Sequence, residues 1–208
     1  PHVSMSVSVS DTHSRKNART PALDALEGMV DLIDQALTSK MTVRAGLQCV
    51  FGCVYEGAVS QKAVLTAAEA LAKTGVTEIN LADTTGMATP IAIREMMRLF
   101  ADKLPKIDIS LHLHDTRGLG LANMFAGYEA GVRIFDVCTG GLGGCPFVRG
   151  AAGNVPTEDA VNMFETMGID TGIDLTALGE AVARFEAALE RQLPGRMKRV
   201  MEFQQTCG

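Results

Sequence analysis

The sequence has no excess of positive charge and no long apolar run. Its 208 residues have a formal net charge of −5, and the densest basic stretch is the short segment Arg196–Arg199. Nucleic-acid-binding domains usually carry a basic face, so we expect no nucleic-acid partner. No apolar stretch approaches the roughly 20 residues that a membrane-spanning helix needs, and no export signal is recognisable. We therefore expect a protein that neither crosses a membrane nor is exported.

The sequence also lacks the cysteine pairs of a disulfide framework or a zinc ribbon. Its five cysteines are odd in number and irregularly placed, which is typical of free thiols in a reducing compartment. Cys49 and Cys53 have three intervening residues, whereas zinc ribbons use two pairs of cysteines with two intervening residues each. We therefore predict a cytoplasmic protein without a zinc ribbon.

Strand and helix patterns alternate along the chain. Apolar residues alternate with serine from Val3 to Ser10, which predicts a strand. Further strands are predicted at 42–48, 78–82, 108–113 and 132–137. Helical periodicity predicts helices at 20–39, 61–73, 89–103, 119–130, 157–167 and 175–192. The polar segment 11–17 is expected to be a loop.

Repeated strand–helix units indicate a parallel sheet covered by helices, and a long series is typical of the (β/α)8 TIM barrel. Five strands are predicted where a closed barrel has about eight. We therefore predict an α/β fold, a TIM barrel represented by its C-terminal five βα units, with about 90 to 110 further residues before Pro1. Residues 1–170 are assigned to this partial barrel, and 171–208 to a C-terminal helical extension packing on it.

Two histidines stand two positions apart at the end of one predicted strand. Side chains alternate along a strand, so His112 and His114 point to the same face. Neutral imidazole is a good ligand of divalent metals, and two from one strand would supply half of a coordination shell. Hydrogen-bonded core histidines, or a surface strand, are the alternatives. The amide oxygen of Asn154 is the candidate third ligand, against an ordinary role in a loop or cap.

Two further residues are candidates for catalysis. Asp83 directly follows a buried strand, where a carboxylate acts as a base or positions one; the alternative is a turn or N-cap aspartate. The glycine-rich segment 140–144 precedes Cys145, so a mobile loop would present this thiol as a proton donor to a substrate. The alternative for Cys145 is a buried small residue. Active sites of parallel barrels lie at the carboxyl ends of the strands, and we expect these residues at that rim.

Five motifs together resemble one family. In chain order they are CVFGCVYEG at 49–57, DTTG at 83–86, HLHDT at 112–116, GGLGGCP at 140–146 and GNVPTED at 153–159. They span most of the chain and resemble 3-hydroxy-3-methylglutaryl-CoA lyase (HMG-CoA lyase), a family of metal-dependent TIM-barrel lyases that acts in leucine degradation and ketone-body formation.

The resemblance implies a reaction and a set of site residues. It implies cleavage of an acyl-CoA substrate to acetyl-CoA and acetoacetate by a homo-oligomer, expected to be a dimer. His112, His114 and Asn154 would bind Mg²⁺ or Mn²⁺. Asp83 and His112 would serve proton transfer at the tertiary hydroxyl of the substrate, and Cys145 would act as the acid towards the enolate. Glu158 matches a family glutamate near the site.

Some features depart from the family pattern. The family's fourth metal ligand (an aspartate beside a catalytic arginine) and a further acidic residue have no counterpart here. Arg117 stands where an aromatic residue is usual, and Val54 where proline is usual. Two alternatives therefore stay open. One is a condensing acyltransferase of the isopropylmalate or homocitrate synthase type, although the Cys145 loop favours the lyase. The other is an inactive fragment.

Overall fold

The computed structural model of the chain describes residues 1–144 and 153–206. It contains two compact units. The first unit comprises residues 1–113 and 122–136, and the second comprises residues 114–121 and 137–208. The predicted division into domains at residue 170 stays a prediction.

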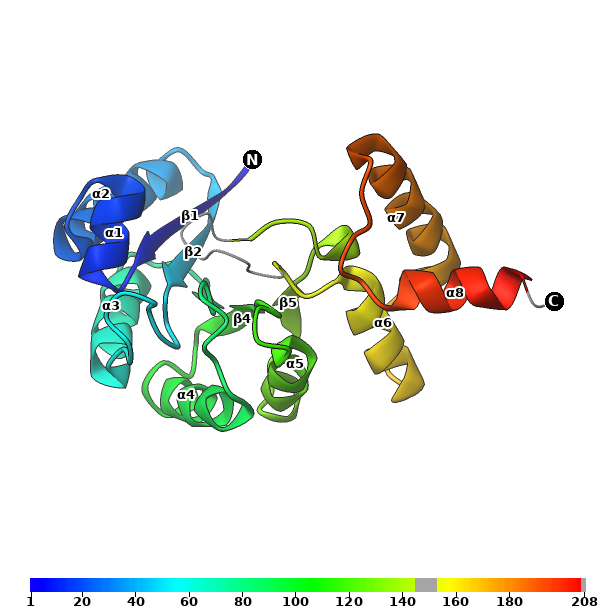
Figure 1. The fold of residues 1–208 in the computed structure, drawn as a ribbon. Helices are drawn as coiled ribbons and strands as arrows, with labels where there is room; N and C mark the ends of the chain where they lie inside the picture. Colours follow the sequence, from blue (N-terminus) through cyan, green and yellow to red (C-terminus); the bar gives the residue numbers. More distant parts are fainter. Residues whose placement is uncertain (145–152, 207–208) are drawn as a thin grey trace. The chain divides into compact units, whose positions relative to one another are not determined.

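The first unit is built on one parallel sheet (Figure 1). Its strands are β1 (His2–Ser8), β2 (Thr42–Gln48), β3 (Glu78–Ala82), β4 (Asp108–His112) and β5 (Ile134–Asp136). They lie side by side in chain order, and every neighbouring pair is parallel. Parallel neighbours that follow chain order are the arrangement found in a (β/α) barrel. The predicted α/β fold with a five-stranded parallel sheet is confirmed.

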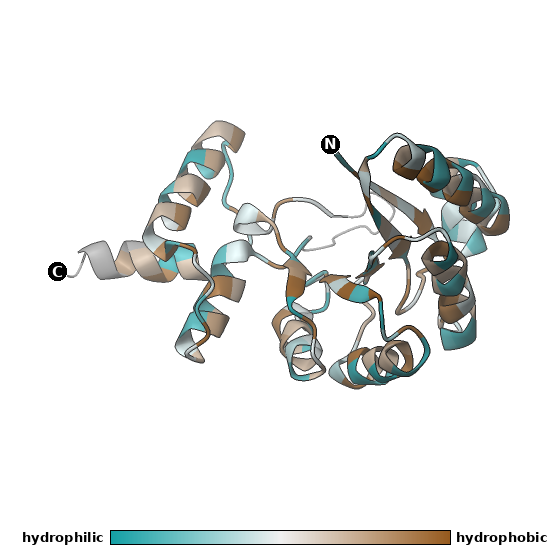
Figure 2. Ribbon diagram, turned by 180° about the vertical axis from the view of Figure 1, so that it is seen from behind, coloured by the Kyte–Doolittle hydropathy of each residue, from teal (hydrophilic) through white to brown (hydrophobic). Residues whose placement is uncertain are grey.

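Helices follow the strands. They are α1 (Asp11–Ala18), α2 (Ala22–Thr38), α3 (Gln61–Lys73), α4 (Pro90–Lys103) and α5 (Gly120–Glu129). Helix α4 begins as predicted, because Thr89 Oγ1 accepts a hydrogen bond from the Ala92 N–H (3.2 Å) and Pro90 occupies the first turn. Hydrophobic and hydrophilic residues alternate along α2, α3 and α4 (Figure 2), as expected where one helix face is buried against the sheet.

The prediction of a loop at 11–17 is wrong, because these residues form helix α1. The hydroxyl of Ser10 caps the helix by accepting a hydrogen bond from the His13 N–H (3.2 Å). Asp11 lies in the first turn and pairs with Arg15 at 2.6 Å, one helical turn later. The helix buries His13 and Ser14 rather than apolar residues. Apolar periodicity therefore could not reveal it.

The second unit contains a short 3-10 turn and three helices. These elements are η1 (Thr139–Gly141), α6 (Thr157–Thr166), α7 (Leu175–Leu189) and α8 (Met197–Thr206). Helices α6 and α7 are predicted from the sequence, but α8 is not. Its first turn is capped by the Asp159 carboxylate, which accepts hydrogen bonds from the backbone N–H groups of Arg196 (2.8 Å) and Met197 (2.8 Å). A cap supplied from a distant part of the sequence leaves no local signal.

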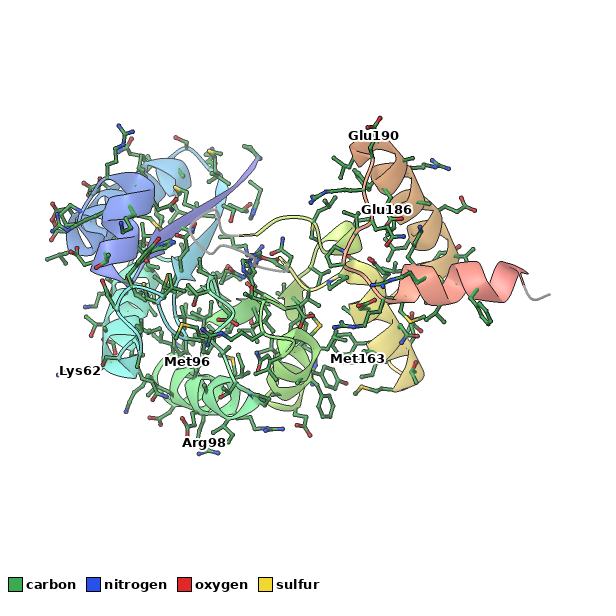
Figure 3. All side chains as sticks on the ribbon, viewed as in Figure 1. Lys62, Met96, Arg98, Met163, Glu186 and Glu190 are labelled. Carbon is green, nitrogen blue, oxygen red and sulfur yellow. The ribbon has the colours of Figure 1, made fainter. Side chains whose placement is uncertain are left out.

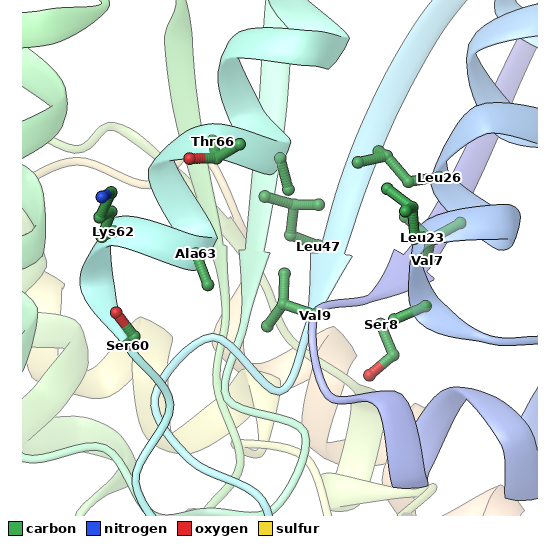
Figure 4. Close-up of a pocket in the computed structure, with 12 residues that line it drawn as sticks. Val7, Ser8, Val9, Leu23, Leu26, Leu47, Ser60, Lys62, Ala63 and Thr66 are labelled. Atoms are coloured by element: carbon green, nitrogen blue, oxygen red, sulfur yellow. The ribbon is translucent and has the colours of Figure 1, made fainter.

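The helix side of the sheet contains a shallow apolar pocket of about 400 Å³ (Figure 4). Its lining includes Val7, Val9, Leu23 and Leu47, with Lys62 as the one charged residue. The sequence-predicted site residues do not line this pocket. Within the described part of the chain, no helix combines the length and apolar character that crossing a bilayer requires.

Candidate functional site

One face of the sheet in the first unit is polar. Side chains alternate along each strand, so Ile79, Leu81 and Leu111 are buried in the core on one face. The opposite face carries polar residues from four neighbouring strands. They are Arg44 on β2, Glu78 and Asn80 on β3, Ser110 and His112 on β4, and Asp136 on β5.

Arg44 connects these polar residues. Its Nη2 donates hydrogen bonds to Asp136 Oδ2 (2.6 Å) and to Ser110 Oγ (3.1 Å), and its Nε lies 2.8 Å from Glu78 Oε1. The Arg44 side chain is 19% exposed, so this cation is largely removed from water. A partly buried charge needs such compensation, because desolvation is costly. The network therefore fixes the polar face across β2, β3, β4 and β5.

His112 contacts this network through Asp136. Its Nδ1 lies 3.5 Å from Asp136 Oδ2. Burial acts to raise the pKa of Asp136, but the hydrogen bonds from His112 and Arg44 outweigh burial, and the pKa lies below its ordinary value. Asp136 is therefore a carboxylate, and not an acid, at neutral pH.

Asp83 lies directly beyond β3 and is 1% exposed. Its backbone N–H donates to the carbonyl oxygen of His112 (2.8 Å), which places it beside the end of β4. Its Oδ1 accepts hydrogen bonds from the N–H groups of Met87 (2.8 Å) and Ala88 (3.1 Å). One carboxylate oxygen of Asp83 thus stabilises the turn, which is the role of a turn aspartate given above as the alternative to catalysis.

In the second unit, His114 and Asn154 form an isolated antiparallel bridge. His114 is 6% exposed. The Asn154 Nδ2 donates to the carbonyl oxygen of Leu142 (2.7 Å), which fixes the orientation of the amide. The amide oxygen, Oδ1, is buried and accepts no hydrogen bond from any residue that the structure describes. A buried amide oxygen without a donor is costly, and a hard divalent cation is a partner that would satisfy it.

Glu158, in the first turn of α6, is fully buried. Its Oε2 accepts a hydrogen bond from the Gly140 N–H (3.0 Å), and its Oε1 has no partner within residues 1–144 and 153–206. Burial, aided by the negative charge of Asp159, raises the pKa of Glu158 above its ordinary value. A carboxyl group of this kind holds its proton closer to neutral pH than an exposed glutamate does.

The family model described as HMGL-like matches residues 1–184 of this sequence. The chain belongs to the HMGL-like family.

The relatives of this HMGL-like chain agree with the resemblance carried by its motifs. It is 38% identical over 196 residues to a protein named Hydroxymethylglutaryl-CoA lyase YngG of Bacillus subtilis, covering 94% of this chain and 66% of the relative. It is 41% identical over 197 residues to (R)-citramalyl-CoA lyase of Chloroflexus aurantiacus, covering 93% and 61%. The chain thus spans about two thirds of these relatives or slightly less. The resemblance to HMG-CoA lyase is confirmed.

A solved structure supports the fold. The crystal structure of the Bacillus subtilis HMG-CoA lyase is 37% identical and superposes with a TM-score of 0.92, over 97% of this chain and 67% of the other. The prediction that the chain forms part of a TIM barrel is therefore confirmed.

The structure brings some predicted site residues of this HMGL-like chain together. Asp83 and His112 are adjacent in the first unit, and His114 and Asn154 are adjacent in the second. His112 and His114 belong to different units, so their joint role stays a prediction. Cys145 lies outside the described residues. Among those described, no group of three or more His, Cys, Asp or Glu side chains is placed to hold a metal, and an amide ligand such as Asn154 is not of these types.

Sequence reasoning missed the segment Leu193–Met197. Leu193 is 4% exposed and packs on Gly140, where any side chain larger than hydrogen would collide with it. A methyl group on Gly195 would collide with Glu158 Oε1. The segment therefore closes over Glu158 and η1. Its contacts join residues more than thirty positions apart in the sequence, and the pair Pro194-Gly195 was the only local signal for a turn.

We expect Gly195→Ala to destabilise the protein by about 1–3 kcal/mol, the usual cost of overpacking a filled site. Urea unfolding followed by circular dichroism measures this effect. Gly28→Ala is the matched control, because a Cβ there meets nothing within 4 Å, and alanine stabilises a helix interior by about 0.5–1 kcal/mol relative to glycine. Equal unfolding midpoints for the two variants would show that Gly195 is not needed at Glu158.

Proposed function

We propose that the protein containing this chain is a divalent-metal-dependent carbon–carbon lyase. Its substrate is 3-hydroxy-3-methylglutaryl-CoA or a close 3-hydroxyacyl-CoA, and its products from the first are acetyl-CoA and acetoacetate. Membership of the HMGL-like family and relatives named as lyases of CoA thioesters support the proposal. The observation that supports it most directly is the buried amide oxygen of Asn154, which has no protein donor among the described residues and belongs to a residue bridged to His114 through the backbone.

The proposed ligands of the cation are His112, His114 and Asn154, with Mg²⁺ or Mn²⁺ as the metal. Imidazole nitrogen and amide oxygen suit these ions, which also retain water or substrate oxygens in their shell. When bound, such a cation polarises the hydroxyl and carboxyl oxygens that it contacts and orients them.

The residues of the chain account for the proton transfers of this proposal. Asp83 takes the proton of the tertiary hydroxyl, and His112, adjacent to Asp83, serves this transfer. As this oxygen becomes the carbonyl of acetoacetate, the carbon–carbon bond breaks and its electron pair passes to the thioester enolate. Cys145 gives a proton to the enolate carbon and acetyl-CoA leaves. Glu158, whose pKa burial raises, matches a glutamate of the family and is proposed to hold a proton in this reaction.

Acetoacetate formation tests the proposal. The purified protein that contains this chain is incubated with Mg²⁺ and 3-hydroxy-3-methylglutaryl-CoA, with EDTA in a parallel reaction. Metal-dependent release of acetoacetate is expected. A protein that instead releases CoA from acetyl-CoA and a 2-oxo acid would be a condensing acyltransferase. A folded protein with neither activity would contradict the proposal. For the chain taken alone the inactive fragment stays an alternative, because the family's fourth metal ligand and catalytic arginine have no counterpart in it. The homo-oligomer and the cytoplasmic location stay predictions.

Citramalyl-CoA is a second candidate substrate, because 41% identity links the chain to a lyase named for it. Arg117 is the residue to test. It is exposed, follows the His114–Asp115–Thr116 segment, and a guanidinium there could bind a carboxylate or phosphate through two hydrogen bonds.

We expect Arg117→Tyr to change the ratio of kcat/KM for citramalyl-CoA and 3-hydroxy-3-methylglutaryl-CoA by about 10-fold or more, since a hydrogen bond to a charged group contributes about 1.5–3 kcal/mol. Arg98→Tyr is the control, because Arg98 is exposed on α4 and points away from the sheet (Figure 3). An unchanged ratio in Arg117→Tyr would remove Arg117 from substrate selection.

A further inference from the structure

The proposed reaction gives no role to Asp136, a half-buried carboxylate of the first unit. Asp136 is the last residue of β5, and in the parallel register it stands directly opposite His112 at the end of β4. Both side chains lie on the polar face of the sheet. The Asp136 Oδ2 lies 3.5 Å from His112 Nδ1, and Nδ1 is one of the two ring nitrogens that can bind a metal or carry a proton.

We infer that Asp136 is a positioning residue that holds His112 in one tautomer and one orientation. A carboxylate offers only hydrogen-bond acceptors. The nitrogen that faces it must therefore be the N–H donor, and in a neutral imidazole the proton then resides on Nδ1. The lone pair of the ring then lies on Nε2. Carboxylates that orient metal-binding histidines in this way raise the basicity of the ligand nitrogen.

Asp136 is itself held in place. Arg44 donates to its Oδ2 at 2.6 Å, and Asn80 Nδ2 lies 3.4 Å from the same atom. Arg44 in turn contacts Glu78 (2.8 Å) on β3 and Ser110 (3.1 Å) on β4. Because all of these residues lie on hydrogen-bonded strands, the carboxylate cannot follow a rotating imidazole. The network from Arg44 to Asp136 thus defines where the His112 ring points.

The tautomer can be measured directly in the metal-free chain. The protein has four histidines, so ¹⁵N-histidine labelling gives a simple long-range ¹H–¹⁵N spectrum, and loss of one signal in His112→Gln assigns His112. From the position of the Asp136 carboxylate at His112 Nδ1, we expect the neutral imidazole of His112 to carry its hydrogen on Nδ1. Protonation on Nε2 in the wild-type chain would overturn the inference.

Asp136→Asn is the matching variant. Arg44 and His112 both face the same oxygen of Asp136, Oδ2. Asparagine keeps the shape but replaces this charged oxygen by a neutral amide oxygen, which is a weaker acceptor for the Nδ1–H of His112. We expect the imidazole to shift towards the Nε2–H tautomer. Glu78→Gln is the control, because it also removes a carboxylate from Arg44, but Glu78 stands opposite Asp108, at the other end of β4 from His112. Equal tautomer shifts in both variants would mean that the whole network, and not Asp136, orients His112.

A second measurement tests whether Asp136 affects metal binding by His112, and this part of the inference rests on the proposed function. Mn²⁺ binding, followed by the EPR signal of the free ion, should weaken by about 10–100-fold in Asp136→Asn, the usual effect of losing an outer-shell partner, and should be unchanged in Glu78→Gln. Wild-type binding that Asp136→Asn leaves intact would overturn the positioning role towards the metal. A wild-type chain that binds no Mn²⁺ would count against the proposed function, and the tautomer measurement would then decide the inference alone.

Discussion

Asp83→Asn is expected to lower kcat for acetoacetate formation by about 10²–10⁴-fold, the range that a positioned general base contributes. The asparagine oxygen can still accept the hydrogen bonds from the Met87 and Ala88 N–H groups, so the turn after β3 should keep its shape. What the variant loses is the ability to take a proton. The expected signature is a fall in kcat with an unchanged unfolding midpoint.

The control for Asp83 lies on a neighbouring strand. Asp108 is the first residue of β4 and is exposed, whereas His112 is the last residue of the same strand. Surface substitutions usually change stability little, so Asp108→Asn should leave kcat within about twofold of the wild-type value. Activity in Asp83→Asn as high as in Asp108→Asn would assign Asp83 a purely structural role in the turn.

Asn154→Ala is expected to lower the affinity for Mn²⁺ by more than about 100-fold. Loss of an outer-shell partner alone typically lowers metal affinity about 10–100-fold. The Asn154 amide oxygen is proposed to contact the ion itself, so its loss should have a larger effect. Titration with Mn²⁺ monitored by EPR measures the change, and turnover should fall with it at limiting metal.

Asn123→Ala provides a matched comparison for Asn154. Asn123 is also a buried amide whose Nδ2 donates to a backbone carbonyl, that of Ala88 (3.0 Å). Both variants therefore lose an amide–carbonyl hydrogen bond, which is typically worth about 0.5–1.5 kcal/mol. If both variants bound Mn²⁺ as tightly as wild type, the Asn154 amide would be a structural group only.

The fold could be predicted from the sequence wherever it depends on local pattern. The strands β2 and β3 and the helix α3 have the predicted bounds, because alternation, helical periodicity and flanking glycines are read within one element. Helices α1 and α8 could not be predicted in this way. The first is short and polar, and the second is capped by the distant carboxylate of Asp159.

The same distinction between local pattern and distant contacts applies to the candidate site. His114 is bridged to Asn154, and Asp83 lies beside His112. Both pairs consist of residues that the sequence singles out, and their roles stay predictions. The Arg44–Asp136 ion pair joins residues 92 positions apart, and such a separation has no periodic signature. One signal was present: Arg44 is a cation between Val43 and Ala45 in an otherwise uncharged strand, and such a charge needs a partner nearby.

The most direct test of the metal site is the anomalous diffraction of Mn²⁺ in crystals grown with that ion. We expect one strong peak within coordination distance of the Asn154 amide oxygen and of the imidazoles of His112 and His114. A well-ordered crystal with no peak at Asn154 Oδ1, or with a peak only at other residues, would contradict the proposed metal site.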